Sequence, residues 1–269
     1  MITIDEDTMW VKCDSLDDYA THAVERDSDW SRSQESRAGK DESFYGPDSF
    51  QQCVDRVRTG WREGYQRLHD KLVDFKVSST LEDVPTIERD VSGFAFDVPA
   101  YIAGDPACML SQTDSPEREV TRLMVCRTAS WLVTPEQIEN YGVAMMATIE
   151  KLESEGKSVE LSVYFASTSG SYKMREIVKI KSAGEYMSED SLAFVFAHTG
   201  MLRRLHFGVV EGTPNEWNFC HGYGTVDNKW KPEGDYVNFP MIDNFRNQCE
   251  SVESAIGVIN GILAKQGTI

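Results

Sequence analysis

Two apolar runs, Arg122-Leu-Met-Val-Cys-Arg127 and Val159-Glu-Leu-Ser-Val-Tyr-Phe165, predict buried strands in the second half of this 269-residue chain. Between them, Thr134-Pro-Glu-Gln137 predicts a helix start with a capping threonine, a proline at the first helical position and a glutamine that can complete a capping box. Gly156 is expected to end this helix. Strand, helix and strand form a βαβ unit, which requires parallel pairing and a right-handed crossover.

The next segment, Ser171-Tyr-Lys-Met-Arg-Glu-Ile-Val-Lys-Ile-Lys181, predicts a strand in a hairpin with 159–165. Its four cations occupy odd positions: Lys173, Arg175, Lys179 and Lys181. Its even positions include three apolar residues: Met174, Val178 and Ile180. Because alternate side chains of a strand point to opposite faces, this pattern predicts one cationic face and one apolar face.

The rest of the chain supplies further elements of an α/β protein. We expect a strand at 9–13, a helix from Ser15, a polar loop over 25–45, a helix from Ser188, a strand at 235–241 and a closing helix through 252–263. A long helix capped by Asp48 is predicted from one apolar stripe: Phe50, Val54, Val57, Trp61, Tyr65, Leu68, Leu72 and Phe75.

Residues 77–121 are rich in proline, and the block Gly93–Met109 is expected to be a loop pinned to the domain surface. The predicted organisation is therefore an acidic, partly irregular segment over 1–45, a long helix and loop region over 46–120, and an α/β core over 121–269. The sheet is expected to be mixed, around the βαβ core.

Charge limits where an anionic partner can bind. The chain has a formal net charge of -17, and residues 1–50 contain 13 Asp/Glu against 5 Lys/Arg. Such a surface repels phosphates, so any nucleic-acid contact must be confined to a local basic face. A hydrophobic content of 41% is sufficient for a real core.

Enzyme, metal and membrane signatures are missing from the sequence. The six cysteines form no C-x-x-C pair, and His221 beside Cys220 lacks further ligands nearby, so neither a zinc site nor a cofactor is expected. There is no phosphate-binding glycine loop, no G-x-S-x-G and no membrane-length apolar run. We therefore expect a non-enzymatic cytoplasmic protein with reduced cysteines.

The candidate DNA-binding residues combine cations with aromatic rings. Lys173, Arg175, Lys179 and Lys181 form the predicted track, and Tyr164 and Tyr172 supply stacking faces in the same hairpin. Two further basic spots are predicted to extend it: Arg203 with Arg204, and Lys229-Trp230-Lys231. Two plainer interpretations stay open. Strand lysines often block edge-to-edge pairing, and Arg203 or Arg204 can pair with a nearby carboxylate.

The α/β arrangement also resembles a von Willebrand A-type domain. In that fold an Asp-x-Ser-x-Ser run after the first strand binds a divalent metal, whereas the matching stretch here is Arg127-Thr-Ala-Ser130. A hard cation requires carboxylate oxygen, and Arg127 would repel it. The resemblance therefore implies a degenerate domain without a working metal site.

Three blocks resemble a group of bacteriophage proteins: 93–109, 122–165 and Leu192-Ala-Phe-Val-Phe-Ala-His-Thr-Gly-Met-Leu-Arg-Arg-Leu205. Within this group, the chain looks similar to the single-stranded-DNA-binding RNA polymerase cofactors of Schitoviridae. The resemblance implies binding of melted DNA at middle promoters and recruitment of a phage RNA polymerase in the host cytoplasm. The alternatives are a protein-interaction module of von Willebrand A type and, least favoured, a nuclease with scattered carboxylates.

Overall fold

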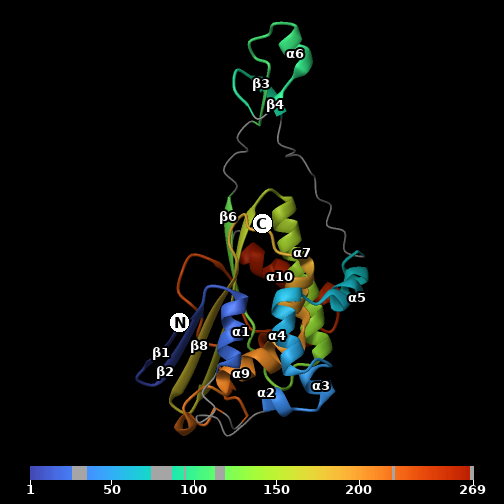
Figure 1. The fold of residues 1–269 in the computed structure, drawn as a ribbon. Helices are drawn as coiled ribbons and strands as arrows, with labels where there is room; N and C mark the ends of the chain where they lie inside the picture. Colours follow the sequence, from blue (N-terminus) through green and yellow to red (C-terminus); the bar gives the residue numbers. More distant parts are fainter. Residues whose placement is uncertain (26–34, 74–86, 94, 113–118, 220–221, 267–269) are drawn as a thin grey trace.

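The computed structural model describes residues 1–25, 35–73, 87–93, 95–112, 119–219 and 222–266. Most strands belong to one mixed seven-stranded sheet in the order β1-β2-β8-β7-β6-β10, with β9 added beside β7 (Figure 1). Its strands are β1 Ile2–Asp5, β2 Thr8–Cys13, β6 Val120–Cys126, β7 Ser158–Ser169, β8 Tyr172–Lys181, β9 Thr225–Val226 and β10 Val237–Phe239. The predicted α/β class is confirmed.

The centre of the sheet is the predicted βαβ unit. β6 and β7 are parallel, with Leu123 opposite Leu161, and α7, Pro135–Ser154, connects them. Thr134 and Gln137 form the expected capping box. β8 returns antiparallel to β7, as the hairpin prediction requires. Parallel pairs with β2 and β10 then extend the sheet on either side.

The helices pack on one face of this sheet (Figure 1). They are α1 Leu16–Val24, α4 Phe50–Thr59, α5 Arg62–Val73, α7, α8 Glu189–Ala197, α9 Phe207–Val210 and α10 Val252–Lys265, with short α2 Glu35–Ala38 and α3 Glu42–Tyr45. A π-helical turn, η1 Met201–His206, precedes α9, and three 3-10 turns follow: η2 Asn215–Trp217, η3 Ile242–Asn244 and η4 Arg246–Gln248. Their apolar sides share one large core with the sheet.

Strand alternation explains why the two faces differ. Val163 of β7 and Val178 of β8 point into the large core, whereas their neighbours Tyr164 and Ile177 belong to a small second cluster. This second cluster contains residues of strands and of the 226–241 region, and no helical residue among those described. We call the sheet face that carries it the open face. The resemblance to a von Willebrand A-type domain stays a prediction.

Two helices replace the long helix predicted over 48–75. α4 ends at Gly60, whose φ of +72° lies in the left-handed region, and α5 begins at Arg62. The expected cap was also wrong, because Ser49 makes the capping box with Gln52. The apolar stripe nevertheless packs on the core through Phe50, Val54, Val57, Trp61, Tyr65 and Leu68. The side chain of Leu72, and Phe75, lie outside the described residues.

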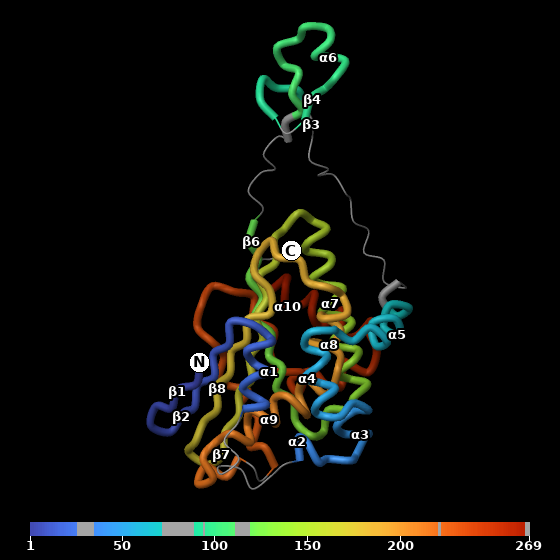
Figure 2. Tube along the Cα trace, in the orientation of Figure 1, coloured from blue at the N-terminus to red at the C-terminus, as the bar shows by residue number. Residues whose placement is uncertain are grey.

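The block expected to be an irregular loop contains a small sheet of its own. β3 Ile87–Asp90, β5 Met109–Gln112 and β4 Ala95–Phe96 pair in that order, and α6 Val98–Ile102 follows β4. Figure 2 shows this unit, which we call the 87–112 module, apart from the large sheet. Five of its apolar side chains are more than half exposed: Val91, Phe96, Val98, Tyr101 and Ile102. Phe94 lies outside the described residues.

Part of the predicted polar loop at 25–45 is also helical. Asp41 caps α3 by accepting from the backbone N–H of Ser43, and Tyr45 at its end is buried. α2 supplies the buried Ser36. Residues 26–34 of the predicted loop lie outside the described residues. The two short helices matter for the site because they cover the arginines of η1.

Candidate nucleic-acid interface

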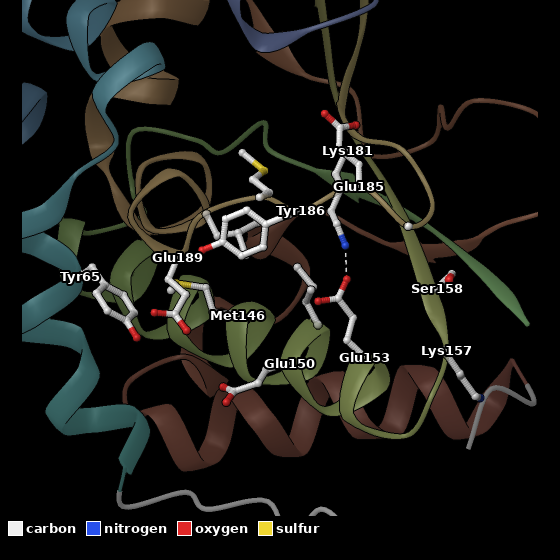
Figure 3. A pocket seen from close by; sticks show the side chains of 14 residues that line it. Tyr65, Met146, Glu150, Glu153, Lys157, Ser158, Lys181, Glu185, Tyr186 and Glu189 are labelled. Atoms are coloured by element: carbon white, nitrogen blue, oxygen red, sulfur yellow. Dashed lines mark hydrogen bonds and ion pairs between the residues drawn. The ribbon is translucent and has the colours of Figure 1, made fainter. Parts of the chain in front are cut away.

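The cationic row of β8 is interrupted by a β-bulge. Lys179 is opposite Ser162 on β7, but Lys181 is opposite Leu161, so Ile180 is an extra residue in β8. An extra residue moves the next side chain to the other face. Lys181 therefore points to the helical side, where it is 5% exposed and forms an ion pair with Glu153 of α7 (Figure 3). The prediction that Lys181 belongs to the cationic face was wrong.

Lys173 and Arg175 do lie on the open face, each with a carboxylate partner. Lys173 Nζ is 3.2 Å from Asp7 Oδ2, and about half of the lysine side chain remains exposed. Arg175 is 4% exposed, and its Nη2 donates to Asp227 Oδ2 at 2.5 Å. Burial lowers the pKa of Arg175, while Asp227 opposes that effect. Arg175 is thus a structural cation, so its prediction as a DNA contact was wrong.

Trp230 covers this part of the open face. The Arg175 guanidinium lies 4.9 Å from the centre of the Trp230 ring, and the indole meets Trp10 edge-on at 5.9 Å. Trp230 also contacts Tyr164 edge-on at 5.7 Å. The indole remains partly exposed. The loop that carries Trp230 therefore brings its two flanking lysines to the open face.

The two predicted tyrosines are not stacking platforms in this structure. Tyr164 is on the open face but only 3% exposed, and its hydroxyl accepts a hydrogen bond from Asn238 Nδ2 at 3.4 Å. Burial raises the pKa of Tyr164 well above its usual value. Tyr172 is on the helical face and stacks on Trp217 at 4.8 Å. Tyr164 is therefore buried away from a base, and Tyr172 uses one face of its ring to stack on Trp217.

Arg203 and Arg204 are far from the open face, inside the helical layer. Arg203 is 2% exposed and donates to the carbonyl oxygens of Phe44 and Val133. Arg204 is 5% exposed and donates to the carbonyl oxygen of Ser36. Burial lowers the pKa of Arg203 to about 10. The prediction that these arginines extend a DNA track was wrong, because segments of the N-terminal third cover them.

Four lysines of the open face remain available to an anion. Lys12, Lys179, Lys229 and Lys231 have no carboxylate within ion-pair distance among the described residues. Lys12, Lys229 and Lys231 are exposed, and Lys179 is half-buried. Lys12 was missed in the sequence because its strand, β2, pairs with β8 across about 165 residues of chain.

An open groove of about 830 Å³ continues this basic surface towards the sheet edge. Lys229, Trp230 and Lys231 form one side, and Lys265 at the end of α10 forms the other. Tyr236 contributes a second aromatic wall, and Glu233 a carboxylate. Of the predicted residues, Lys179 therefore lies on the open face with Lys12, and Lys229 and Lys231 line the groove that Lys265 also borders.

Two groups of described residues bring three potential metal ligands together: Cys13 with Asp18 and His22, and Asp48 with Cys53 and His198. Burial raises the pKa of both thiols to about 12, so they stay protonated at neutral pH. Arg56 and His198 already surround Asp48. Both groups are therefore explained as packing and ion-pair contacts. Cys220 and His221 lie outside the described residues.

The stretch compared with the metal-binding run of a von Willebrand A-type domain has a carboxylate partner from elsewhere in the chain. Ser130 donates its backbone N–H and its hydroxyl to the two oxygens of Asp243, each at 3.0 Å. This contact fixes the loop after β6 to η3. No local pattern in the sequence indicates this contact, because the two residues are 113 positions apart.

These features define a mixed α/β protein with one helical face and one open, lysine-bearing face. The chain belongs to the family described as domain of unknown function DUF7192, whose profile matches residues 4–269. No curated protein and no solved structure matches the chain. Within the described residues, the helices are too short or too polar to cross a membrane.

Proposed function

We propose that this protein is a non-enzymatic single-stranded-DNA-binding protein and that its open face holds the DNA. The observation that supports this function best is the group of four unpaired lysines, Lys12, Lys179, Lys229 and Lys231, next to the indoles of Trp10 and Trp230. Single-strand binders combine cations for the phosphates with aromatic faces for the bases.

Electrostatics allows such binding despite the acidic character of the chain. The formal net charge is -17, but salt screens exposed charges beyond about 8 Å at physiological ionic strength. A phosphate at the open face therefore responds mainly to its immediate surroundings. There, Asp7, Glu160 and Asp227 are paired with cations of the sheet, and the four lysines form no ion pair, although Glu185 near Lys179 and Glu233 in the groove reduce their positive potential.

The biological setting we propose comes from the sequence resemblance to Schitoviridae polymerase cofactors. The bound DNA is then the melted strand of a middle promoter, and the protein partner is the phage RNA polymerase, in the host cytoplasm. The open face supports the DNA-binding part of this proposal only.

A second candidate function, protein interaction, is supported by the 87–112 module. Five of its apolar side chains are more than half exposed, on a unit of only three short strands and α6. Contiguous exposed apolar surface is typical of protein contact sites. We propose the phage RNA polymerase as the occupant, because the resemblance requires a polymerase contact that the open face, occupied by DNA, does not provide.

Fluorescence anisotropy with a labelled single-stranded oligonucleotide, titrated at several salt concentrations, tests DNA binding. With one phosphate neutralised by each of the four lysines, the slope of log K against log salt is expected to be about −3, at about −0.7 per contact. The double variant Lys229→Gln/Lys231→Gln should flatten the slope by about 1.4. Lys40→Gln, an exposed lysine of the α2–α3 connection, is the matched control. Equal slopes for all three proteins would reject the open face as the site.

Binding of purified phage RNA polymerase tests the second function. Phe96→Ser and Ile102→Ser should weaken that binding at least tenfold and leave oligonucleotide affinity unchanged. Tyr186→Ser, an 86% exposed aromatic outside the module, is the control. If all three variants bind the polymerase as tightly as the parent does, the module is not the contact surface.

A further inference from the structure

A pocket of about 500 Å³ lies at the edge of the sheet where β6 ends, and it shares no lining residue with the groove of Lys229 and Lys231. The loop after β6 contributes Thr128 to Trp131, β7 contributes Ser167, and η1 contributes Arg203. Ligands of α/β proteins bind preferentially outside the carboxyl ends of their strands. The volume is in the range of small-molecule sites. We call it the carboxyl-edge pocket.

The inner end of the pocket is rich in hydrogen-bond donors. Arg203, Ser167 and His206 border it, and each is 2% exposed. Arg203 has no carboxylate within ion-pair distance among the described residues, and it donates hydrogen bonds to the neutral carbonyls of Phe44 and Val133. A buried guanidinium without an anion is costly, so this end of the pocket favours a negatively charged group.

Ser167 provides independent evidence for a missing partner. Its hydroxyl is buried and has no hydrogen-bond partner in the part of the chain that the structure describes. Buried hydroxyls are normally satisfied, because an unmade hydrogen bond costs about 1–3 kcal/mol. A ligand oxygen beside Ser167 would remove this cost. His206 Nδ1 lies 2.8 Å from Glu176 Oε1, an ion-pair contact without hydrogen-bond alignment.

The remaining walls are mainly aromatic. Phe44 lies under the Arg203 guanidinium at 4.0 Å, and Phe207 stacks on Tyr223 at 3.7 Å. Trp131 is at the rim and 76% exposed. The single carboxylate among the lining residues, Glu35, is exposed and accepts a hydrogen bond from the Tyr45 hydroxyl. The pocket is therefore apolar and flat-sided at its mouth and cationic at its inner end.

We propose that the carboxyl-edge pocket binds a small planar aromatic acid. Its carboxylate accepts hydrogen bonds from Arg203 and Ser167, and its ring lies among Phe44, Phe207 and Trp131. Charge-assisted hydrogen bonds from an arginine recognise the carboxylate, and the aromatic walls select a flat ring. This site is on a different part of the molecule from the proposed DNA surface, and neither proposal depends on the other.

Thermal unfolding of the full chain tests the proposal with three acids as probes: benzoate, 4-hydroxybenzoate and indole-3-carboxylate. At about 10 mM, an acid with a millimolar Kd raises Tm measurably, because it binds only the folded state. The corresponding amides are the controls for charge. At least one acid should raise Tm more than its amide does. No rise with any acid, or an equal rise with the amide, would overturn the proposal.

Two variants locate the binding. Ser167→Ala should weaken the best acid about tenfold, the loss expected for one hydrogen bond to a charged group. Trp131→Ala should weaken it about fivefold or more and, being at an exposed position, should leave the fold intact. Ser162→Ala on the open face of β7 and Tyr186→Ala are matched controls. Equal acid affinity in all four variants would place the ligand elsewhere and refute this pocket as its site.

Discussion

Lys179 and Lys181 are two residues apart in β8, yet their side chains lie on opposite faces of the sheet. Lys179 remains on the open face, whereas Lys181 is buried against Glu153 of α7. The extra residue, Ile180, causes the difference. One lysine is therefore available to a ligand, and the other holds the strand to its helix.

Substitution of the two lysines should consequently affect different properties, stability for Lys181 and oligonucleotide affinity for Lys179. Lys181→Gln is expected to lower the free energy of unfolding by about 1–2 kcal/mol, less than for a fully buried pair because Glu153 is 41% exposed. Lys179→Gln should leave stability within about 0.5 kcal/mol of the parent and weaken oligonucleotide binding. Urea unfolding and anisotropy on both variants give the comparison. A loss of stability in Lys179→Gln together with a loss of oligonucleotide binding in Lys181→Gln would contradict the placement of the two side chains by the bulge.

Gly60 and Gly257 should respond oppositely to alanine. Gly60 has a φ of +72°, and an added Cβ would be 2.6 Å from Asp190 Cβ, so Gly60→Ala is expected to cost about 2 kcal/mol or more. Gly257 is inside α10 with open space around it, so Gly257→Ala should stabilise the protein by about 0.5–1 kcal/mol. Denaturant midpoints measure both. Equal effects would mean that the break between α4 and α5 does not depend on Gly60.

The Arg175–Asp227 pair should be essential for stability. Asp227→Asn leaves a 4% exposed guanidinium without its carboxylate, which is expected to cost about 3 kcal/mol. Asp235→Asn, at an exposed position of the same loop region, should change stability by less than about 0.5 kcal/mol. Chemical denaturation distinguishes them. A loss of less than about 1 kcal/mol for Asp227→Asn would show that water reaches Arg175.

Acid should destabilise the protein partly through Asp48. His198 Nε2 at 3.2 Å and the guanidinium of Arg56 hold the pKa of Asp48 well below its usual range. A carboxyl whose folded pKa is depressed stabilises the protein above its unfolded pKa of about 3.9, and this contribution is lost as pH falls towards the folded value. Between about pH 5 and 2, the free energy of unfolding should therefore fall more steeply in the parent than in Asp48→Asn. Identical pH profiles would exclude this contribution.

Local signals predicted much of the fold. The capping box at Thr134 and the strand pattern at 122–165 gave the βαβ unit, and Ser15 and Ser188 began their helices as expected. These features depend on neighbouring residues alone, so one stretch of sequence contains them completely. The break at Gly60 was not predicted, because glycine occurs both inside helices and in the left-handed conformation that ends them.

The candidate site was harder to predict because burial is a long-range property. Arg203 bonds the carbonyl of Phe44 across 159 positions, and Arg204 bonds that of Ser36 across 168. Nothing near either arginine in the sequence shows these partners. The Lys229–Lys231 stretch was easier to predict as a candidate anion contact, because its cation, indole and second cation are consecutive in the sequence and stay close together wherever the loop lies.

The bulge at Ile180 also makes strand length a determinant of which side chains face solvent. Removing that one residue would place Lys181 directly after Lys179 in a regular strand, still opposite Leu161 and still on the helical side. Keeping Ile180 but pairing it regularly would instead turn the ammonium group of Lys181 to the open face and release α7 from its partner strand. Among relatives of this chain, a one-residue gap at this point should therefore preserve the contact between β8 and α7.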